Sequence, residues 1–170
     1  MNQSAILLAL EKGGWDPLLH ALYGFDTLQE SRNRISHLLE QHIELFGPKE
    51  VKVISSPGRT ELGGNHTDHN QGKVIAASVH LDAVAVVSPE RTSRIDFVSE
   101  GYAPLQVDIS SLDPREEEKG RTESLVRGVW AGAKKRGFDP KGFQGVMQSR
   151  VPAGSGLSSS AVIEVLLGSI

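Results

Sequence analysis

Two short segments of this 170-residue chain concentrate groups that could do chemistry. The first, residues 57–72, reads PGRTELGGNHTDHNQG and contains four glycines, an arginine, two histidines and an aspartate. So many short polar groups cannot form a hydrophobic core. A tight polar loop could instead direct several donors and acceptors at one hydrophilic ligand. The alternative is a turn-rich connector that satisfies its own hydrogen bonds.

A metal site is a second alternative for this segment. His66, Asp68 and His69 carry nitrogen and oxygen atoms that could be metal ligands. However, adjacent residues of an extended segment point to opposite sides, and the chain has no HExxH pattern on a helix. A metal-dependent hydrolase therefore stays a minor hypothesis, which metal analysis of the purified protein would decide.

The second segment, residues 151–161, reads VPAGSGLSSSA and leads into an apolar stretch. Glycines let the backbone turn so that successive N–H groups converge, and the start of a helix adds the positive end of its dipole. This arrangement suits a polyphosphate. The serines could cap the helix or ligate the Mg²⁺ that accompanies a nucleotide. A serine-capped helix after a turn, without a ligand, is the simpler interpretation.

Three better-known glycine motifs are absent from the second segment. A Walker A loop needs Gly-Lys-Ser/Thr, and a dinucleotide fingerprint needs a third glycine after Gly154 and Gly156. A hydrolase nucleophile elbow needs Gly-x-Ser-x-Gly, whereas Ser160 occupies the last position here. The segment therefore predicts phosphate binding without identifying a known class by itself.

The composition limits the classes of protein that could carry these segments. The chain is 38% hydrophobic and has 18 Lys+Arg against 21 Asp+Glu, a net charge of −3, so it shows no overall basic charge for nucleic acid or membranes. It has no cysteine, which excludes disulfides, thiolate catalysis and iron–sulfur sites. No apolar run is long enough for a membrane span, and the N-terminus does not resemble a signal peptide. We expect a soluble, cytoplasmic protein.

The periodicity of apolar residues predicts the elements that must position both segments. Residues up to 47 show helical spacing, with Asp16-Pro17 as a helix start and Gly47-Pro48 as a helix stop. Residues 113–120 form a charged loop that should be solvated, and a helix around residues 125–135 follows. Six stretches have the character of strands: residues 51–54, 74–77, 81–87, 94–98, 105–109 and 142–151. Helices, then a mainly hairpin-connected sheet, then helices indicate an α+β fold.

Taken together, the two segments resemble the galactokinase branch of the GHMP kinases. The signature of that branch reads approximately Pro-Gly-Arg-x-Asn-Leu-Ile-Gly-Glu-His-Thr-Asp-Tyr-Asn-x-Gly-x-Val. It is matched by Pro57, Gly58, Arg59, Leu62, Gly64, His66, Thr67, Asp68, Asn70, Gly72 and Val74. The family's phosphate motif, Pro-x-x-x-Gly-Leu-x-Ser-Ser-Ala, is matched by Pro152, Gly156, Leu157, Ser159, Ser160 and Ala161.

The resemblance implies both a fold and an activity. The fold would be the GHMP-kinase N-terminal domain, a mixed but mainly antiparallel sheet packed with helices. Residues 1–48 would be a helical segment, and residues 49–170 an incomplete sugar- and ATP-binding domain. The activity would be ATP-dependent phosphorylation of a hexose, galactose to galactose 1-phosphate in the first instance. A galactokinase-like sensor that binds sugar and ATP and acts through a protein partner is the alternative.

The resemblance also implies roles for individual residues. Arg59 would sit beside the reacting sugar hydroxyl and balance charge during phosphoryl transfer, which depends mostly on positioning and electrostatics. Asn65, His66 and Asp68 would bind the sugar. Ser160 would help to hold Mg²⁺. The ATP phosphates would be bound by Pro152, Gly154, Ser155, Gly156, Leu157, Ser158, Ser159 and Ser160.

The chain departs from the family pattern at several positions. Asn65 stands where the family has Glu, and because an amide both donates and accepts, the hydroxyl pattern that it recognises could differ. Glu61 replaces Asn, Gly63 replaces a bulky aliphatic residue and His69 replaces Tyr. The family's catalytic aspartate and C-terminal domain lie further downstream. We therefore expect an N-terminal fragment that is inactive alone, with sugar, ATP and the missing C-terminal domain as its partners.

Overall fold

A five-stranded sheet forms the centre of the molecule in a computed structural model that describes residues 1–64, 70–152, 154 and 156–170. The strand order is β1-β2-β5-β3-β4, and every neighbouring pair is antiparallel except β3 and β5. The mixed, mainly antiparallel sheet predicted from the sequence is confirmed. The strands are β1 (Lys52–Gly63), β2 (Ile75–Pro89), β3 (Arg94–Ser99), β4 (Leu105–Asp108) and β5 (Phe143–Ser149).

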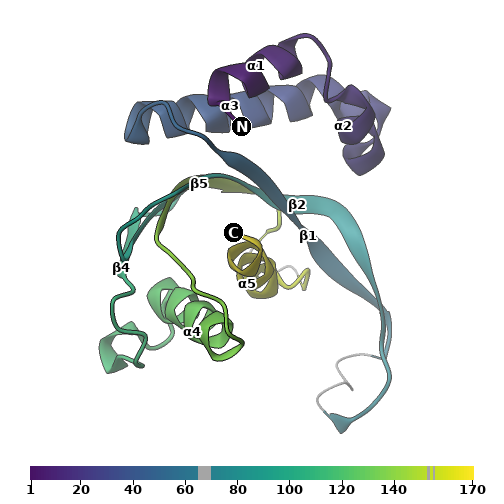
Figure 1. Ribbon diagram of the computed structural model, residues 1–170. Coiled ribbons are helices and arrows are strands. Elements are labelled where there is room, and N and C mark those ends of the chain that lie inside the picture. Colours follow the sequence, from purple (N-terminus) through teal and green to yellow (C-terminus); the bar gives the residue numbers. More distant parts are fainter. Residues whose placement is uncertain (65–69, 153, 155) are drawn as a thin grey trace.

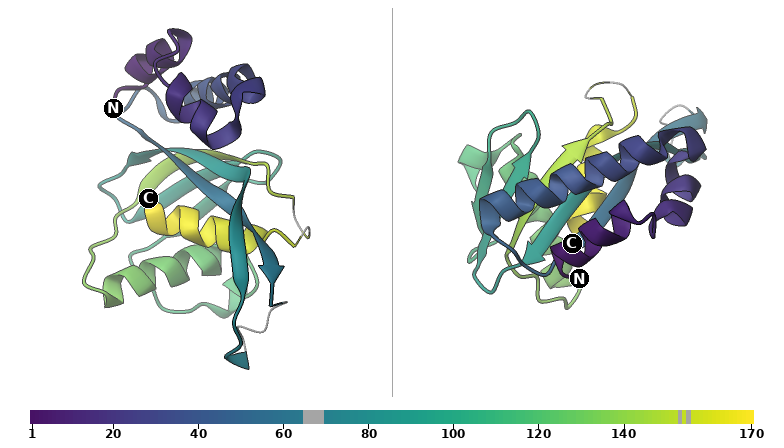
Figure 2. Two further views of the ribbon diagram at one scale, coloured as in Figure 1. Left: turned by 90° about the vertical axis from the view of Figure 1, so that its right-hand side faces the viewer. Right: turned by 90° about the horizontal axis from the view of Figure 1, so that it is seen from above.

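Helices cover both faces of this sheet (Figure 1). One face carries α1 (Gln3–Glu11), α2 (Asp16–Tyr23) and α3 (Leu28–Phe46), and the other carries α4 (Thr122–Lys135) and α5 (Ser159–Ser169). Seen from above, α3 lies across the strands (Figure 2). Short 3₁₀ turns at Phe25–Thr27 and Glu116–Glu118 complete the described elements.

The second half of strand β2, residues 82–88, is buried on both of its faces. Val84 and Val86 belong to the hydrophobic cluster beneath α1–α3, whereas Ala83, Ala85 and Val87 belong to the cluster with α4 and α5. Successive side chains of a strand point to opposite faces, so a strand between two helical layers needs a continuous apolar run. This explains why residues 83–87 are uniformly apolar.

The helical N-terminal segment forms as predicted. In α3, the stripe that includes Ile35, Leu38 and Leu39 is buried, and Gly47 ends the helix with φ of 75°. In α2, by contrast, Leu18 and Leu22 are exposed. The N-cap of α2 is Trp15, so the proposed cap Asp16 lies inside the first turn and forms an ion pair with Arg32. The division at residue 48 stays a prediction.

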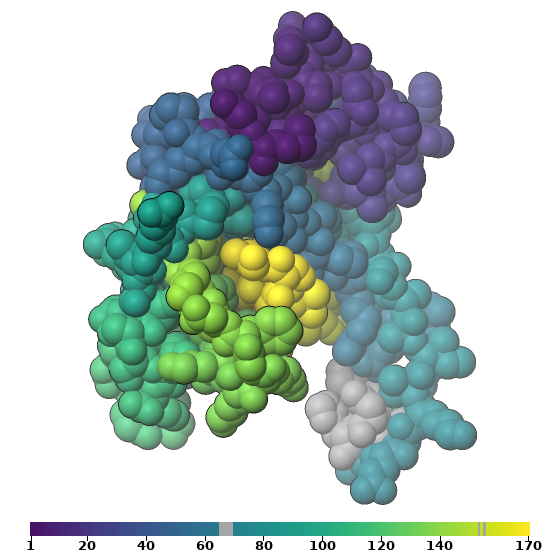
Figure 3. Space-filling model, in the orientation of Figure 1, coloured from purple at the N-terminus to yellow at the C-terminus, as the bar shows by residue number. Residues whose placement is uncertain are grey.

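Strand β1 is longer than predicted. The strand was expected to end near Ile54, but it continues through Pro57 and Gly58 to Gly63, so half of the first segment is a strand rather than a loop. Because β1 lies at the edge of the sheet, Pro57 can lack an N–H without removing a bond from the interior of the ladder. The hairpin of β1 and β2 stands clear of the α4 side of the molecule (Figure 3).

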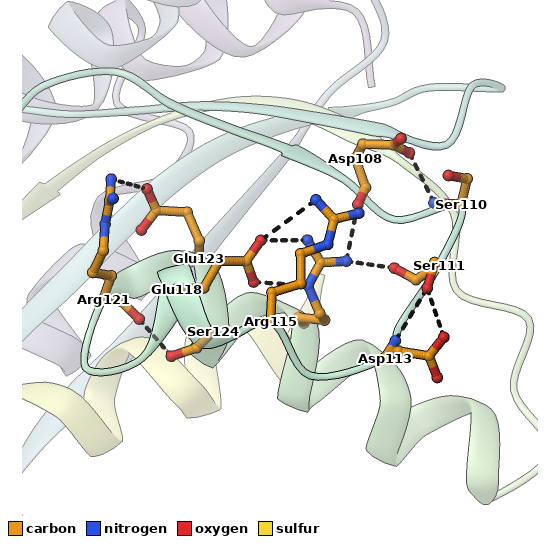
Figure 4. Close-up of polar contacts among 10 residues, drawn as sticks. Asp108, Ser110, Ser111, Asp113, Arg115, Glu118, Arg121, Glu123 and Ser124 are labelled. Carbon is orange, nitrogen blue, oxygen red and sulfur yellow. Dashed lines mark hydrogen bonds and ion pairs between the residues drawn. The ribbon is translucent and has the colours of Figure 1, made fainter.

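The charged loop at residues 113–120 is not wholly solvated as predicted. The side chain of Glu118 is buried and accepts two hydrogen bonds from Arg127 of α4, at 2.8 Å from Nε and 2.6 Å from Nη2. Figure 4 shows the carboxylate of Glu118 facing the guanidinium of Arg115, with which it forms an ion pair at 3.8 Å, whereas Arg121 pairs with Glu123. A buried carboxylate needs such a partner.

In the part of the chain that the structure describes, no helix is both long and apolar enough to span a membrane.

Candidate sugar- and phosphate-binding site

Arg59 lies on the edge strand, directly after an irregularity in the β1–β2 ladder. The register shifts between Pro57, which pairs with Asp82, and Arg59, which pairs with Ser78. The Arg59 side chain is 45% exposed, and its Nη2 donates to Glu61 Oε1 at 2.9 Å. Residues two apart on a strand share a face, so Glu61 is placed to hold the guanidinium at the surface.

The second motif forms a glycine turn that leads into α5. Gly154 and Gly156 have φ of +72° and +77°, values that residues other than glycine rarely adopt. Ser158, at the N-cap, is also left-handed with φ of 59°. The first turn of α5 contains no acidic residue, so its positive dipole end is not neutralised from within the helix.

The described parts of the two motifs are in direct contact. The backbone N–H of Arg59 donates to the carbonyl oxygen of Leu157 at 3.3 Å. A Cβ added to Gly58 would lie 3.1 Å from Val79 Cγ2 and 3.4 Å from Val151 Cγ2. Gly58 therefore allows the edge strand to pass close to the start of the glycine turn.

Ser160 and Ser159 occupy the first turn of α5, and Ser160 is exposed. A hydroxyl at this position is compatible with a role beside a phosphate-bound cation. Within the described ranges no group of three His, Cys, Asp or Glu side chains could hold a metal ion.

Four predicted site residues, Asn65, His66, Asp68 and Ser155, lie outside the described residues, as does His69 of the metal hypothesis. Their roles stay predictions. The described members of the predicted ATP site, Pro152, Gly154, Gly156, Leu157, Ser158, Ser159 and Ser160, form the turn and the beginning of α5.

One large cavity lies away from the two motifs. It has a volume of about 1100 Å³ and lies between α4, the final turn of α5 and β5, lined by Trp130, Phe143 and Leu167 among others. It is therefore at the opposite end of α5 from the glycine turn.

A buried polar network that the sequence patterns did not predict lies where both motif segments leave the sheet. Asp82 of β2 and Arg34 of α3 are ion-paired at 2.6 Å, with side chains only 2% and 4% exposed. Burial and the hydrogen bond to Asp82 raise the pKa of Tyr23 in the same network to about 12. The signal was present: Asp82 is a lone carboxylate inside an apolar strand, and a buried carboxylate needs a partner.

Comparison with known proteins confirms the resemblance that the two motifs predict. A family model described as the galactokinase galactose-binding signature matches residues 40–89. The galactokinase of Lactococcus lactis subsp. lactis (strain IL1403) is 36% identical over 142 residues, covering 82% of this chain and 36% of the relative. The galactokinase of Bacillus subtilis (strain 168) is 33% identical over 127 residues, covering 73% and 33%. This chain thus spans about a third of the length of these relatives.

Solved structures give the same result for the fold. The crystal structure of Lactococcus lactis galactokinase complexed with galactose matches with a TM-score of 0.72 and 32% identity, covering 79% of this chain and 36% of that one. The mevalonate kinase of Methanococcus jannaschii matches with a TM-score of 0.56 and 17% identity, covering 69% and 38%. At that identity the second match shows the fold alone, and it places the chain among GHMP kinase folds.

Proposed function

We propose, from the premise that this chain is a relative of the galactokinases with a GHMP kinase fold, that it supplies the sugar- and ATP-binding part of a hexose kinase. Galactose is the first candidate substrate, and galactose 1-phosphate would be the product. The observation that carries the proposal is the 3.3 Å hydrogen bond from the Arg59 N–H to the Leu157 carbonyl. This bond holds the galactokinase signature next to the glycine turn. Transfer between two substrates requires that the segments that bind them lie close together.

Arg59 is proposed to act on the charge that moves during transfer. Its guanidinium can stabilise a phosphoryl group through several donors. The ion pair with Glu61 is half-exposed, so it holds Arg59 only weakly and the side chain is free to turn towards a more highly charged phosphate. Arg59 would thus orient the phosphoryl group and balance its charge.

The glycine turn and the first turn of α5 are proposed to bind the phosphates of ATP. The left-handed glycines free backbone N–H groups to face a ligand, and the helix N-terminus favours negative charge. Bound ATP would supply the phosphoryl group. Ser160 would contribute its hydroxyl to the Mg²⁺ that accompanies ATP, and these residues fit that role because no side chain of this turn repels a polyphosphate.

The sugar is proposed to be recognised by Asn65, His66 and Asp68. Asp68 would accept hydrogen bonds from sugar hydroxyls, whereas the Asn65 amide could donate as well as accept. We also propose a cytoplasmic location, since the reaction consumes ATP.

A screen of sugars tests this function. The protein that carries this chain would be assayed for ADP release with Mg²⁺, ATP and galactose, N-acetylgalactosamine, glucose or arabinose. In parallel, the 170-residue chain would be titrated calorimetrically with the same sugars and with ATP and Mg²⁺. We expect turnover with at least one hexose and binding of ATP. The absence of turnover with every sugar would overturn the kinase proposal.

A further inference from the structure

We infer that Asp82 and Arg34 form a positioning pair, which fixes the point where both motif segments leave the sheet. The inference rests on the proposed function for what the site binds, but its geometric part can be tested independently. It gives the N-terminal helices α2 and α3 a task in the site, although neither helix contributes to the motifs.

The carboxylate of Asp82 is held by three side chains from three elements. Its Oδ1 accepts from Arg34 Nη1 of α3 at 2.6 Å. Its Oδ2 accepts from the hydroxyl of Tyr23, at the end of α2, and from the hydroxyl of Ser55, on β1, each at 2.5 Å. Three side-chain donors in fixed places leave this carboxylate one orientation.

Arg34 joins strands β2 and β5 at the point where their pairing ends. Its Nε donates to Gln148 Oε1 at 2.7 Å, and its Nη2 donates to the carbonyl oxygens of Gln148 and Asp82 at 2.9 Å and 3.2 Å. The final pair of the β2–β5 ladder, Ala83 with Ser149, is directly adjacent. The planar guanidinium therefore fixes the end of β5 relative to β2.

Asp82 is also the residue from which both motifs diverge. It pairs with Pro57, after which the register of β1 shifts and Arg59 follows. Its carbonyl oxygen accepts from the N–H of Arg150 at 2.8 Å, immediately before the chain enters the glycine turn at Val151. A change in the orientation of Asp82 is thus passed to Arg59 on one side and to the glycine turn on the other.

The energetics of buried ion pairs agree with a positioning role. The free energy needed to remove two charges from water nearly cancels their attraction, so such a pair adds little net stability. Losing one partner, however, leaves an uncompensated buried charge. What the pair provides is a defined geometry. In this protein that geometry lies where Asp82 pairs with Pro57 and accepts from Arg150, on the two segments that lead to Arg59 and Leu157.

The chain contains a matched control for this inference. Arg127 and Glu118 form another buried pair, with side chains 3% and 10% exposed, joined by two hydrogen bonds. This pair lies among α4, the Glu116–Glu118 turn and the end of β4, around the residues drawn in Figure 4. Because β4 and β1 are opposite edges of the sheet, disturbing this pair should destabilise the protein without altering the motifs.

The test compares Asp82→Asn with Glu118→Gln in the 170-residue chain. Amide exchange measured by NMR would report on the N–H groups of Arg59 and Arg150, and titration would measure affinity for ATP with Mg²⁺. We expect both variants to lower the melting temperature. Only Asp82→Asn should speed exchange at the two reporter amides, by about tenfold beyond the change in the control, and weaken ATP binding.

Equal effects of the two variants on the reporter amides and on ATP affinity would overturn the inference, because the pair would then be merely structural. If the unaltered chain binds no ATP but Asp82→Asn alone speeds the reporter amides, the positioning role stands and the proposed function fails. Should Asp82→Asn not fold, Ser55→Ala removes a single donor to the same carboxylate and should give about threefold faster exchange at both amides. No increase in that variant would also overturn the inference.

Discussion

Arg59 carries the proposed chemistry, and among the described residues its side chain forms an ion pair with Glu61. Replacing it with alanine should leave the edge strand intact, because the backbone bond to Leu157 does not involve the side chain. If Arg59 acts on the transferring group, Arg59→Ala should lower kcat by about 10²- to 10⁴-fold while sugar affinity changes little. Arg59→Lys, which keeps the charge but not the fork, should recover part of the loss. A change confined to sugar affinity would contradict this role.

Asn65 is the residue for which sugar preference can be tested directly. The family signature has glutamate here, which only accepts hydrogen bonds, whereas asparagine also donates. Asn65→Glu should therefore shift the ratio of kcat/KM for galactose over N-acetylgalactosamine towards galactose. Asn65→Ala separates the loss of the amide from the gain of a carboxylate. An unchanged ratio in both variants would remove Asn65 from the sugar site.

At the scale of single residues, the sequence was informative where chemistry follows from a local pattern. The turn before α5 could be predicted because its glycines and serines are unusual for a core, whereas the role of Arg59 stays a prediction. The pairing of Asp82 with Arg34 could not be predicted, since the partners are separated by 48 positions and meet only when α3 packs on the sheet. Asp82 signalled only that some buried cation or donor had to exist.

Among the elements, β5 depends on a glycine that precedes it. A Cβ on Gly142 would lie 2.2 Å from the carbonyl oxygen of Arg94 and 2.4 Å from that of Thr92. Backbone atoms cannot move aside readily, so Gly142→Ala should lower the free energy of unfolding by about 1–3 kcal/mol. Gly128, in the exposed part of α4, has no atom within 4 Å of an added Cβ. Gly128→Ala should therefore stabilise the protein by about 0.5–1 kcal/mol. Urea denaturation would measure the free energy of unfolding of both variants. A change of the same sign in the two variants would contradict these expectations.

Helices and strands could be predicted where one hydrophobic period dominates the sequence. They were harder to predict where tertiary contacts determine the extent of an element. The stripe of α3 and the apolar run of β2 gave the correct element types. The extent of β1 could not be predicted, because proline and glycine normally interrupt a strand and only its position at the edge of the sheet permits them. Glu118 was assigned to solvent because its partner Arg127 was not yet known to face it.

At the level of the whole molecule, polar networks around His42 and around Asp82 hold the N-terminal helical layer against the sheet, and each contains a group whose pKa is shifted, at opposite ends of the pH range. His42 of α3 is fully buried, between Gln3 of α1 at 2.9 Å and Ser88 of β2 at 3.1 Å. Burial, and secondarily the charge of Lys49, lower the pKa of His42 below its usual value of 6.5. Tyr23, in the Asp82 network, has a pKa raised from 10.0 to about 12.

These pKa shifts predict how the free energy of unfolding depends on pH. His42 contributes a loss at the acidic edge of this profile and Tyr23 a loss at the alkaline edge. Below about pH 6.5 the unfolded chain protonates His42 before the folded chain does, so stability falls as the pH decreases through this range. Above pH 10.0 the unfolded chain ionises Tyr23 first, so stability falls as the pH rises towards 12. Glu118 and Asp108, whose pKa values are lowered by Arg127 and by hydrogen bonds at Ser110 respectively, should add a loss of stability only at still lower pH.

Urea denaturation across pH would measure this profile. His42→Gln should flatten only the edge near pH 6.5, and Tyr23→Phe only the alkaline edge. If either substitution moved both edges together, the two networks would not be the independent attachments of the helical layer that their separate contacts indicate.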